Sequence, residues 1–173
     1  DRAPVGAEIA EHDVVAAHHN LAHRRSIGRH IVHRLIHQAA VPAGDDISEH
    51  RSCIHCGMDR KAYGFSRMLV QYEDGSSVGL CSLRCVVFEL HANPKRAVKA
   101  ILAADRTERT LIDAKNAAWV MGGAKRGVMT SRPKWAFSTR AAAEAFLEDY
   151  GGAIITWDDA LAAAREDLAQ EVR

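Results

Sequence analysis

The chain has 173 residues, of which 47% are hydrophobic and 26% are charged, a balance typical of a globular protein with a buried core. Its 23 Lys and Arg and 22 Asp and Glu give a formal net charge of +1, which argues against a dedicated nucleic-acid-binding protein. No apolar run approaches the roughly 18 residues of a membrane span.

Apolar residues recur at helical spacing over residues 1–40, which predicts a helical N-terminal segment. Seven of the ten His lie between His12 and His37. Two groups of them share a helical face, namely His19 with His23, and His30 with His33 and His37. Such groups can chelate a divalent ion, although a solvated face beside several arginines is the alternative interpretation. We therefore assign residues 1–47 to a His-rich helical leader.

Residues 48–105 form the first predicted half of the chain. A strand over 68–72, a turn over 73–76 and a return strand over 77–80 predict a hairpin. Ser82 is a candidate N-cap for a helix that ends before Pro94. The run 97–104 fits either a helical turn or a strand.

Residues 106–173 repeat this order. Apolar runs at 111–113 and 117–121 precede strands predicted over 127–130 and 134–137. Thr139 begins a predicted helix that Gly151 ends, a strand follows over 153–157, and Asp158 begins a terminal helix. The repeat predicts an α+β fold of two small ββαβ-like halves followed by a C-terminal helix.

The four cysteines form two close pairs, Cys53 with Cys56 and Cys81 with Cys85, separated by 24 residues. Both sulfurs of each pair can converge on one ion, and two such pairs make a tetrahedral four-thiolate site suited to zinc. Disulfides, a redox-active dithiol or inert buried thiols are the alternatives. His55, between the first two cysteines, is a candidate additional ligand, although the residue inside such a knuckle more often points outward.

Two methionines add soft thioether donors. Met58 lies two residues after Cys56, and Met129 lies in a stretch flanked by Gly and Arg. Thiolate and thioether ligands together select Cu(I) over harder ions. Core packing is the alternative role for each methionine.

Residues 53–94 resemble the YHS/TRASH type of metal-binding knuckle. The matching marks are Cys53-x-x-Cys56-Gly57-Met58, Tyr72 with Asp74-Gly75, Cys81-Ser82-x-x-Cys85, and Phe88 with Asn93-Pro94. Residues 48–161 resemble the nitrous oxide reductase accessory protein (NosL) family. The marks are Cys56-Gly57-Met58, Ile112-Asp113-Ala114, Trp119, Gly122-Gly123, Lys125 to Met129, Trp135-Ala136-Phe137, Phe146, Gly151-Gly152 and Ile154-Ile155.

The NosL resemblance implies a periplasmic, often lipid-anchored Cu(I)-binding protein with two ββαβ-like halves. It implies delivery of copper to apo nitrous oxide reductase and assigns the copper ligands to Cys56, Met58 and Met129. The chain departs from the family pattern in having four cysteines, in its His-rich leader and in lacking the anchoring Cys. It begins at Asp1 without a Met, so we expect a removed N-terminal signal through which the protein could be anchored to a membrane.

The sequence therefore predicts an extracytoplasmic metallochaperone rather than an enzyme, with Cu(I) as cargo and an apo cuproenzyme as acceptor. The predicted ligands are Cys56, Met58 and Met129, supported by Cys53, Cys81 and Cys85. The alternative is an interaction module in which Zn(II) is held by the four cysteines as a closed structural site. A thiol oxidoreductase or organometal lyase is a third, less favoured class. No nucleic-acid partner is expected.

Overall fold

The computed structural model describes residues 45–171 of the chain, and nearly all of the predicted His-rich leader, with its histidine groups, lies outside them. The described part combines helices with antiparallel sheets, so the predicted α+β fold is confirmed. It begins with a short helix, α1 (Asp45–Glu49). Within these residues no helix has both the length and the apolar character needed to cross a membrane.

The first half is built on a four-stranded antiparallel sheet with the order β2-β1-β3-β4. Its strands are β1 (Met68–Tyr72), β2 (Ser77–Leu80), β3 (Val98–Ala104) and β4 (Leu111–Asp113). Helix α2 (Leu83–Ala92) connects β2 to β3. The hairpin has its predicted bounds, and the ambiguous run at 97–104 is strand β3. The sheet extends beyond residue 105 because β4 pairs with β3.

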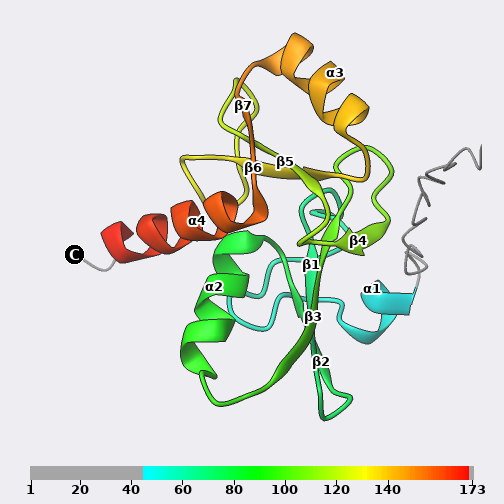
Figure 1. Cartoon of the computed structure of the whole chain (residues 1–173). Coiled ribbons are helices and arrows are strands. Elements are labelled where there is room, and N and C mark those ends of the chain that lie inside the picture. The colour runs from blue at the N-terminus through cyan, green and yellow to red at the C-terminus, as the bar shows by residue number, and fades with distance from the viewer. Residues whose placement is uncertain (1–44, 172–173) are drawn as a thin grey trace, which may run out of the picture. The chain divides into compact units, whose positions relative to one another are not determined.

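The second half repeats the same order around a three-stranded sheet, β6-β5-β7. Its elements are β5 (Ala118–Met121), β6 (Lys134–Phe137), α3 (Arg140–Tyr150) and β7 (Ala153–Ile155). In each half the first strand lies between the second and the third, and a helix precedes the third strand (Figure 1). The prediction of two ββαβ-like halves is thus confirmed. Thr139 caps α3, as predicted, by accepting a hydrogen bond from the Ala142 backbone N–H at 3.1 Å.

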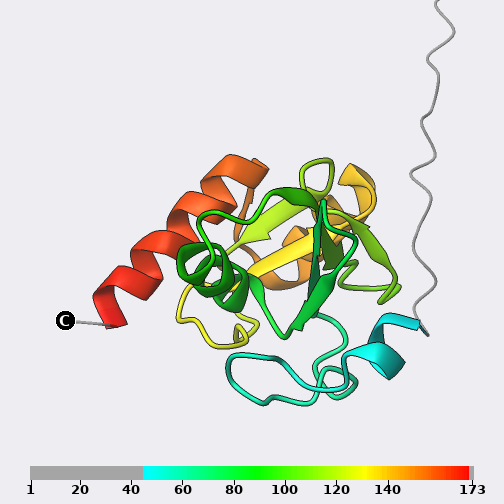
Figure 2. The ribbon, with the colours of Figure 1, turned by 90° about the horizontal axis from the view of Figure 1, so that it is seen from below.

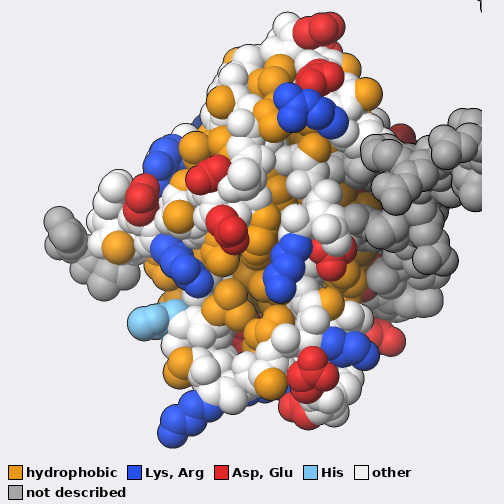
Figure 3. Space-filling model, viewed as in Figure 1, with side chains coloured by type: hydrophobic (Ala, Val, Ile, Leu, Met, Phe, Trp, Pro, Cys, Tyr) orange, Lys and Arg blue, Asp and Glu red, His pale blue; other side chains and the backbone are white. Residues whose placement is uncertain are grey.

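The C-terminal helix α4 (Trp157–Glu171) lies beside α2, as Figures 1 and 2 both show. It begins at Trp157, one residue before its predicted start, and the Trp157 ring lies 5.6 Å from the ring of Trp119 on β5. Ala160 and Ala164 of α4 are buried in the same core cluster as Val86 of α2. Helix α4 therefore joins the two halves. The face drawn in Figure 3 shows apolar side chains gathered near its centre, with Lys or Arg on either side.

The predicted strand at 127–130 is wrong, because this segment is part of a loop between β5 and β6. Met129 has a φ of +58°, in the left-handed region, which a strand residue does not adopt. Hydrogen bonds hold the loop against α4 instead. The Asp167 carboxylate accepts hydrogen bonds from Thr130 Oγ1 at 2.8 Å and from Arg132 Nε at 2.6 Å. These polar contacts take the place of strand pairing.

Candidate metal centre

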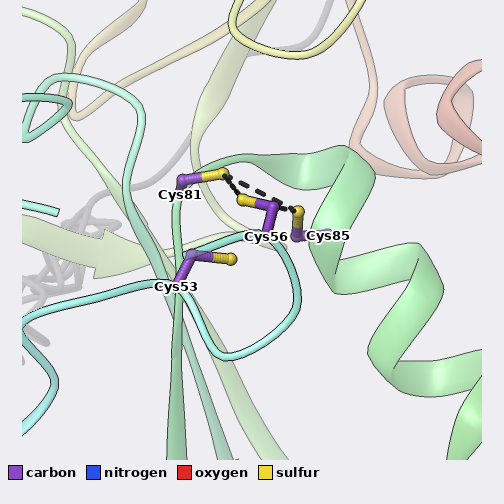
Figure 4. Close-up of side chains that lie close together, drawn as sticks. All are labelled: Cys53, Cys56, Cys81 and Cys85. Carbon is purple, nitrogen blue, oxygen red and sulfur yellow. Dashed lines mark hydrogen bonds between the residues drawn. The ribbon is translucent and has the colours of Figure 1, made fainter. Parts of the chain in front are cut away.

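The four cysteines converge on one point, and their sulfurs all lie within 4.8 Å of one another. The Sγ of Cys56 lies 3.4 Å from that of Cys81 and 3.9 Å from that of Cys85, and Cys81 and Cys85 are 3.7 Å apart (Figure 4). The first pair comes from the loop before β1, and the second comes from the junction between β2 and α2. Segments far apart in the sequence therefore build a single thiol cluster.

The loop over residues 53–58, called here the knuckle, is closed by its own backbone. The Cys53 N–H donates to the Met58 carbonyl, and the Gly57 N–H donates to the Cys53 carbonyl, each at 2.9 Å. Gly57 makes this turn with a φ of +73°, which glycine adopts without strain. The Ile54 N–H donates to the carbonyl of Gly79 at 3.2 Å. That last bond ties the knuckle to β2, next to the second pair of cysteines.

The second pair is placed by the start of a helix. Cys81 directly follows β2, and Cys85 lies in the first turn of α2, where its N–H donates to the Ser82 carbonyl at 3.1 Å. Ser82 holds the predicted N-cap position, although its side chain makes no cap hydrogen bond. The positive end of the helix dipole lies at this turn and offsets part of the cost of negative charge on a metal-bound Cys85 sulfur.

Three of the thiols are buried, and the fourth gives access to the cluster. Cys53, Cys81 and Cys85 are at most 2% exposed, whereas Cys56 is half-buried. All four are free, and their sulfurs lie well beyond the roughly 2.05 Å of a disulfide bond. The structure therefore has the reduced form of the cluster and not the disulfide alternative.

The cluster stabilises one thiolate and opposes further ionisation. Hydrogen bonds from the Cys81 and Cys85 thiols hold the pKa of Cys53 well below its usual range. The same interactions raise the pKa of Cys81 and, with burial, raise the pKa of Cys85 to about 12. Several thiolates crowded in a buried site need a cation to offset their repulsion. Binding of a metal ion would release the remaining thiol protons.

The donor set fits a thiophilic metal ion. A tetrahedral site with metal–sulfur bonds of about 2.3 Å places its sulfurs about 3.8 Å apart. The separations of 3.4 to 3.9 Å between Cys56, Cys81 and Cys85 match that spacing. Soft thiolate ligands favour Cu(I) and Zn(II) over ions that prefer oxygen. Three of the four sulfurs are thus already spaced for a metal ion, and the fourth, of Cys53, lies within 4.8 Å of them.

The His55 side chain forms a hydrogen bond with the Glu89 carboxylate. Its Nε2 lies 2.7 Å from Glu89 Oε2, and its ring packs edge-on against Phe88 of α2 with the ring centroids 4.7 Å apart. Glu89 is buried and also accepts hydrogen bonds from the Tyr72 hydroxyl and, at 3.0 Å, from Asn93 Nδ2. Burial and the Glu89 carboxylate raise the pKa of Tyr72 to about 12, so the phenol remains the donor. The group of candidate ligand atoms that lie within 4.8 Å of one another contains the four cysteines and not His55, so the structure does not bring this candidate additional ligand into the cluster.

The two predicted methionine ligands occupy different surroundings. Met58 is half-buried and packs against the core cluster that includes Cys53, Cys81 and Cys85. Met129 is 38% exposed and lines a depression formed by its own loop. Its neighbours Val128 and Thr130 instead face a small cavity together with residues 82 and 83. The loop thus approaches the start of α2, while the Met129 side chain faces solvent.

Sequence reasoning missed the polar groups that support the cluster. The Arg60 side chain is fully buried, and its Nε donates to the Leu80 carbonyl, directly before Cys81, at 3.2 Å. No feature of the sequence distinguishes this arginine from a surface residue. Glu89 did carry a signal, because it lies four residues after Cys85 and so on the same face of the helix. A carboxylate in that position faces the core.

Comparison with known proteins agrees with the residue pattern. The model of the NosL family matches residues 44–164, well over half of the chain. Among solved structures, the crystal structure of the copper chaperone NosL from Shewanella denitrificans is similar, with 26% sequence identity and a TM-score of 0.48. The match covers 62% of this chain and 87% of that chain. No curated protein matches the chain significantly.

Proposed function

The chain belongs to the NosL family, and from this premise we propose that it is a metallochaperone that binds Cu(I) and passes it to a partner protein. The observation that carries the proposal is the convergence of four free thiols within 4.8 Å, three of them buried. Buried thiolates bind Cu(I) in preference to ions that favour oxygen ligands. The proposed role is that of a carrier, without catalysis of a reaction.

The proposed ligands are Cys53, Cys56, Cys81 and Cys85. Cys56 is the ligand at which exchange begins, because it is the half-buried member of the cluster. An incoming donor from a partner can reach the ion beside Cys56, while the other sulfurs still hold it. Met58 and Met129, the methionines of the family pattern, are proposed as thioether ligands in a loaded or transferring state.

The proposed partner is an apo cuproenzyme such as nitrous oxide reductase, and the proposed location is the periplasm or another extracytoplasmic compartment. Membrane anchoring through an N-terminal signal belongs to the same proposal. The family membership of the chain and the resemblance of its motifs are what support all three proposals. The near-neutral net charge of +1 supports a protein rather than a nucleic acid as partner.

The test is a Cu(I) titration of reduced, anaerobic protein against a chromogenic Cu(I) chelator. Tight stoichiometric binding is expected, and Cys56→Ser and Cys85→Ser should each weaken it. Met129→Leu is compared with Met121→Leu, a control on β5 outside the predicted ligand set. Weaker binding in Met129→Leu alone would support a thioether ligand at that position. Binding that is unchanged in both cysteine variants would refute the proposed site.

Zn(II) bound as a closed structural site is the second candidate, favoured by the sulfur separations of 3.4 to 3.9 Å. The two functions differ in how metal binding couples to folding. A structural zinc is part of the folded state, so Cys81→Ser should then unfold the first half. In a chaperone the same substitution lowers copper affinity and leaves the fold intact. Far-ultraviolet circular dichroism of the metal-free variant distinguishes the two.

A further inference from the structure

We infer that the hydrogen bond between His55 and Glu89 is a clamp that holds the cysteine knuckle against α2 and sets the rate at which the bound metal is released. The inference rests on the proposed function and names the positioning residues of the same site. Neither residue is proposed as a ligand. Both act through the cysteines that their segments carry.

The knuckle end of the clamp is His55, which lies between Cys53 and Cys56 in the sequence. Its Nε2 lies 2.7 Å from Glu89 Oε2, and its side chain is 19% exposed. The edge-on contact with Phe88 orients the ring. A movement of His55 therefore carries along the two cysteines on either side of it.

The helix end of the clamp is fixed in place. Glu89 follows Cys85 by one helical turn, and its side chain is 4% exposed. Its second oxygen, Oε1, is held by the Tyr72 hydroxyl and by Asn93 Nδ2. A buried carboxylate with three donors has one stable position. The bond to His55 thus links the knuckle, which carries two of the four sulfurs, to a rigid point.

Apart from the thiol contacts of the cluster and the packing of Cys53 and Met58 against the core, the knuckle has few polar attachments to the rest of the described chain. Two of its backbone hydrogen bonds are internal, and a third, from the Ile54 N–H to the Gly79 carbonyl, ties it to β2. Cys81 and Cys85, in contrast, belong to the β2–α2 framework. If the knuckle moves away from α2, two of the four sulfurs leave the ion together. The strength of the His55–Glu89 bond therefore sets how often the site opens.

The test uses two substitutions at position 55 and one control. His55→Phe keeps a ring against Phe88 but loses the hydrogen bond, whereas His55→Gln keeps an N–H donor near the Nε2 position. Thr139→Ala is the control, because it removes the cap of α3 in the second half and touches neither the knuckle nor Glu89. His55→Ala replaces the Phe variant if that protein does not fold.

Two rates are measured at constant pH, namely the release of Cu(I) to excess chelator and the labelling of the thiols of the metal-free protein by a maleimide. Loss of an outer-shell partner typically weakens metal binding roughly 10- to 100-fold, so His55→Phe should accelerate release by about that factor. It should also accelerate labelling of the buried thiols. His55→Gln and Thr139→Ala should stay close to wild type in both rates.

Rates in His55→Phe equal to wild type would overturn the clamp and leave the proposed function standing. Equal acceleration in His55→Phe, His55→Gln and Thr139→Ala would also overturn it, because general loosening of the fold would then explain the effect. A wild-type protein that binds no Cu(I) would refute the proposed function. In that case the labelling rates still decide whether the bond closes the knuckle.

Discussion

Asp46 is the carboxylate that neutralises two buried arginines, and its replacement is the sharpest test of how the metal centre is supported. Asp46 Oδ2 lies 2.8 Å from Arg60 Nη2 and 2.9 Å from Arg67 Nε, and Asp46 Oδ1 lies 3.0 Å from Arg67 Nη2. The side chains of Arg60, Arg67 and Asp46 are 0%, 1% and 2% exposed, respectively. Water therefore does little to screen either positive charge once the carboxylate is gone.

The substitution Asp46→Asn keeps the shape of the side chain and removes its charge. Removing one partner of a buried ion pair typically costs about 3 to 5 kcal/mol. An amide N–H would also face a guanidinium, which has no acceptor atom. The total free energy of unfolding of a domain is about 5 to 15 kcal/mol, so the expected loss is a large share of it.

Urea unfolding followed by tryptophan fluorescence measures the loss. With an m-value of about 2 kcal/mol/M, the transition midpoint of Asp46→Asn should fall by roughly 2 M. Glu144→Gln is the matched control, because it breaks the exposed ion pair with Arg140 and should cost only about 0.3 to 0.5 kcal/mol. A loss below about 1 kcal/mol in Asp46→Asn would contradict the argument, since the arginines would then not depend on this carboxylate.

Three further predictions follow from individual contacts. Gly79→Ala should lower the free energy of unfolding by about 1 to 3 kcal/mol, because a Cβ there would lie 2.8 Å from Arg60 Cζ. In the control Gly75→Ala the new Cβ has no atom within 4 Å, so the same urea assay should show only the cost of the positive φ at that position. Although burial raises the pKa of Asp105, backbone hydrogen bonds hold it below its ordinary value. The loss of stability caused by Asp105→Asn should therefore be largest above about pH 4 and should shrink as the pH falls through the pKa of the folded state. Urea midpoints of both proteins at pH 7 and pH 3 check the sign. Withdrawal of Cu(I) by a chelator should leave the circular dichroism spectrum unchanged, because buried side chains form the core without the ion, and a melted fold would instead indicate a structural zinc.

The sequence predicted the cysteine site because both pairs have the spacing that a single ion requires. It predicted the hairpin because polar turn residues separate two short apolar runs. It did not decide the strand over 97–104, because one end of β3 is exposed and its other end is buried on both faces. That burial pattern has neither the alternation of a half-buried strand nor the periodicity of a helix.

Long-range polar contacts account for what the sequence could not predict. The error at 127–130 arose because β-branched and apolar residues there resemble a strand, whereas Thr130 and Arg132 bind Asp167, more than 30 residues later. The sequence alone suggests surface positions for Arg60 and Arg67, because charged side chains are seldom buried. Their burial depends on the carbonyls and the carboxylate that the fold brings to them, and these are distant in the sequence.

A chaperone must hold its ion firmly in transit and release it to a partner, and this site divides those demands between its two pairs of cysteines. Cys81 and Cys85 are fully buried at a strand–helix junction, so in the proposed carrier they are the pair that stays on the ion. The knuckle carries the pair proposed to leave: Cys56 is half-buried and within reach of an incoming ligand, whereas Cys53 is buried and is uncovered only when the loop moves. Because the two pairs lie on separate segments, partial release needs movement of a short loop rather than unfolding of a core. Four thiolates are therefore compatible with transfer, provided that the attachment of the knuckle to α2 is weaker than the attachment of α2 to the fold.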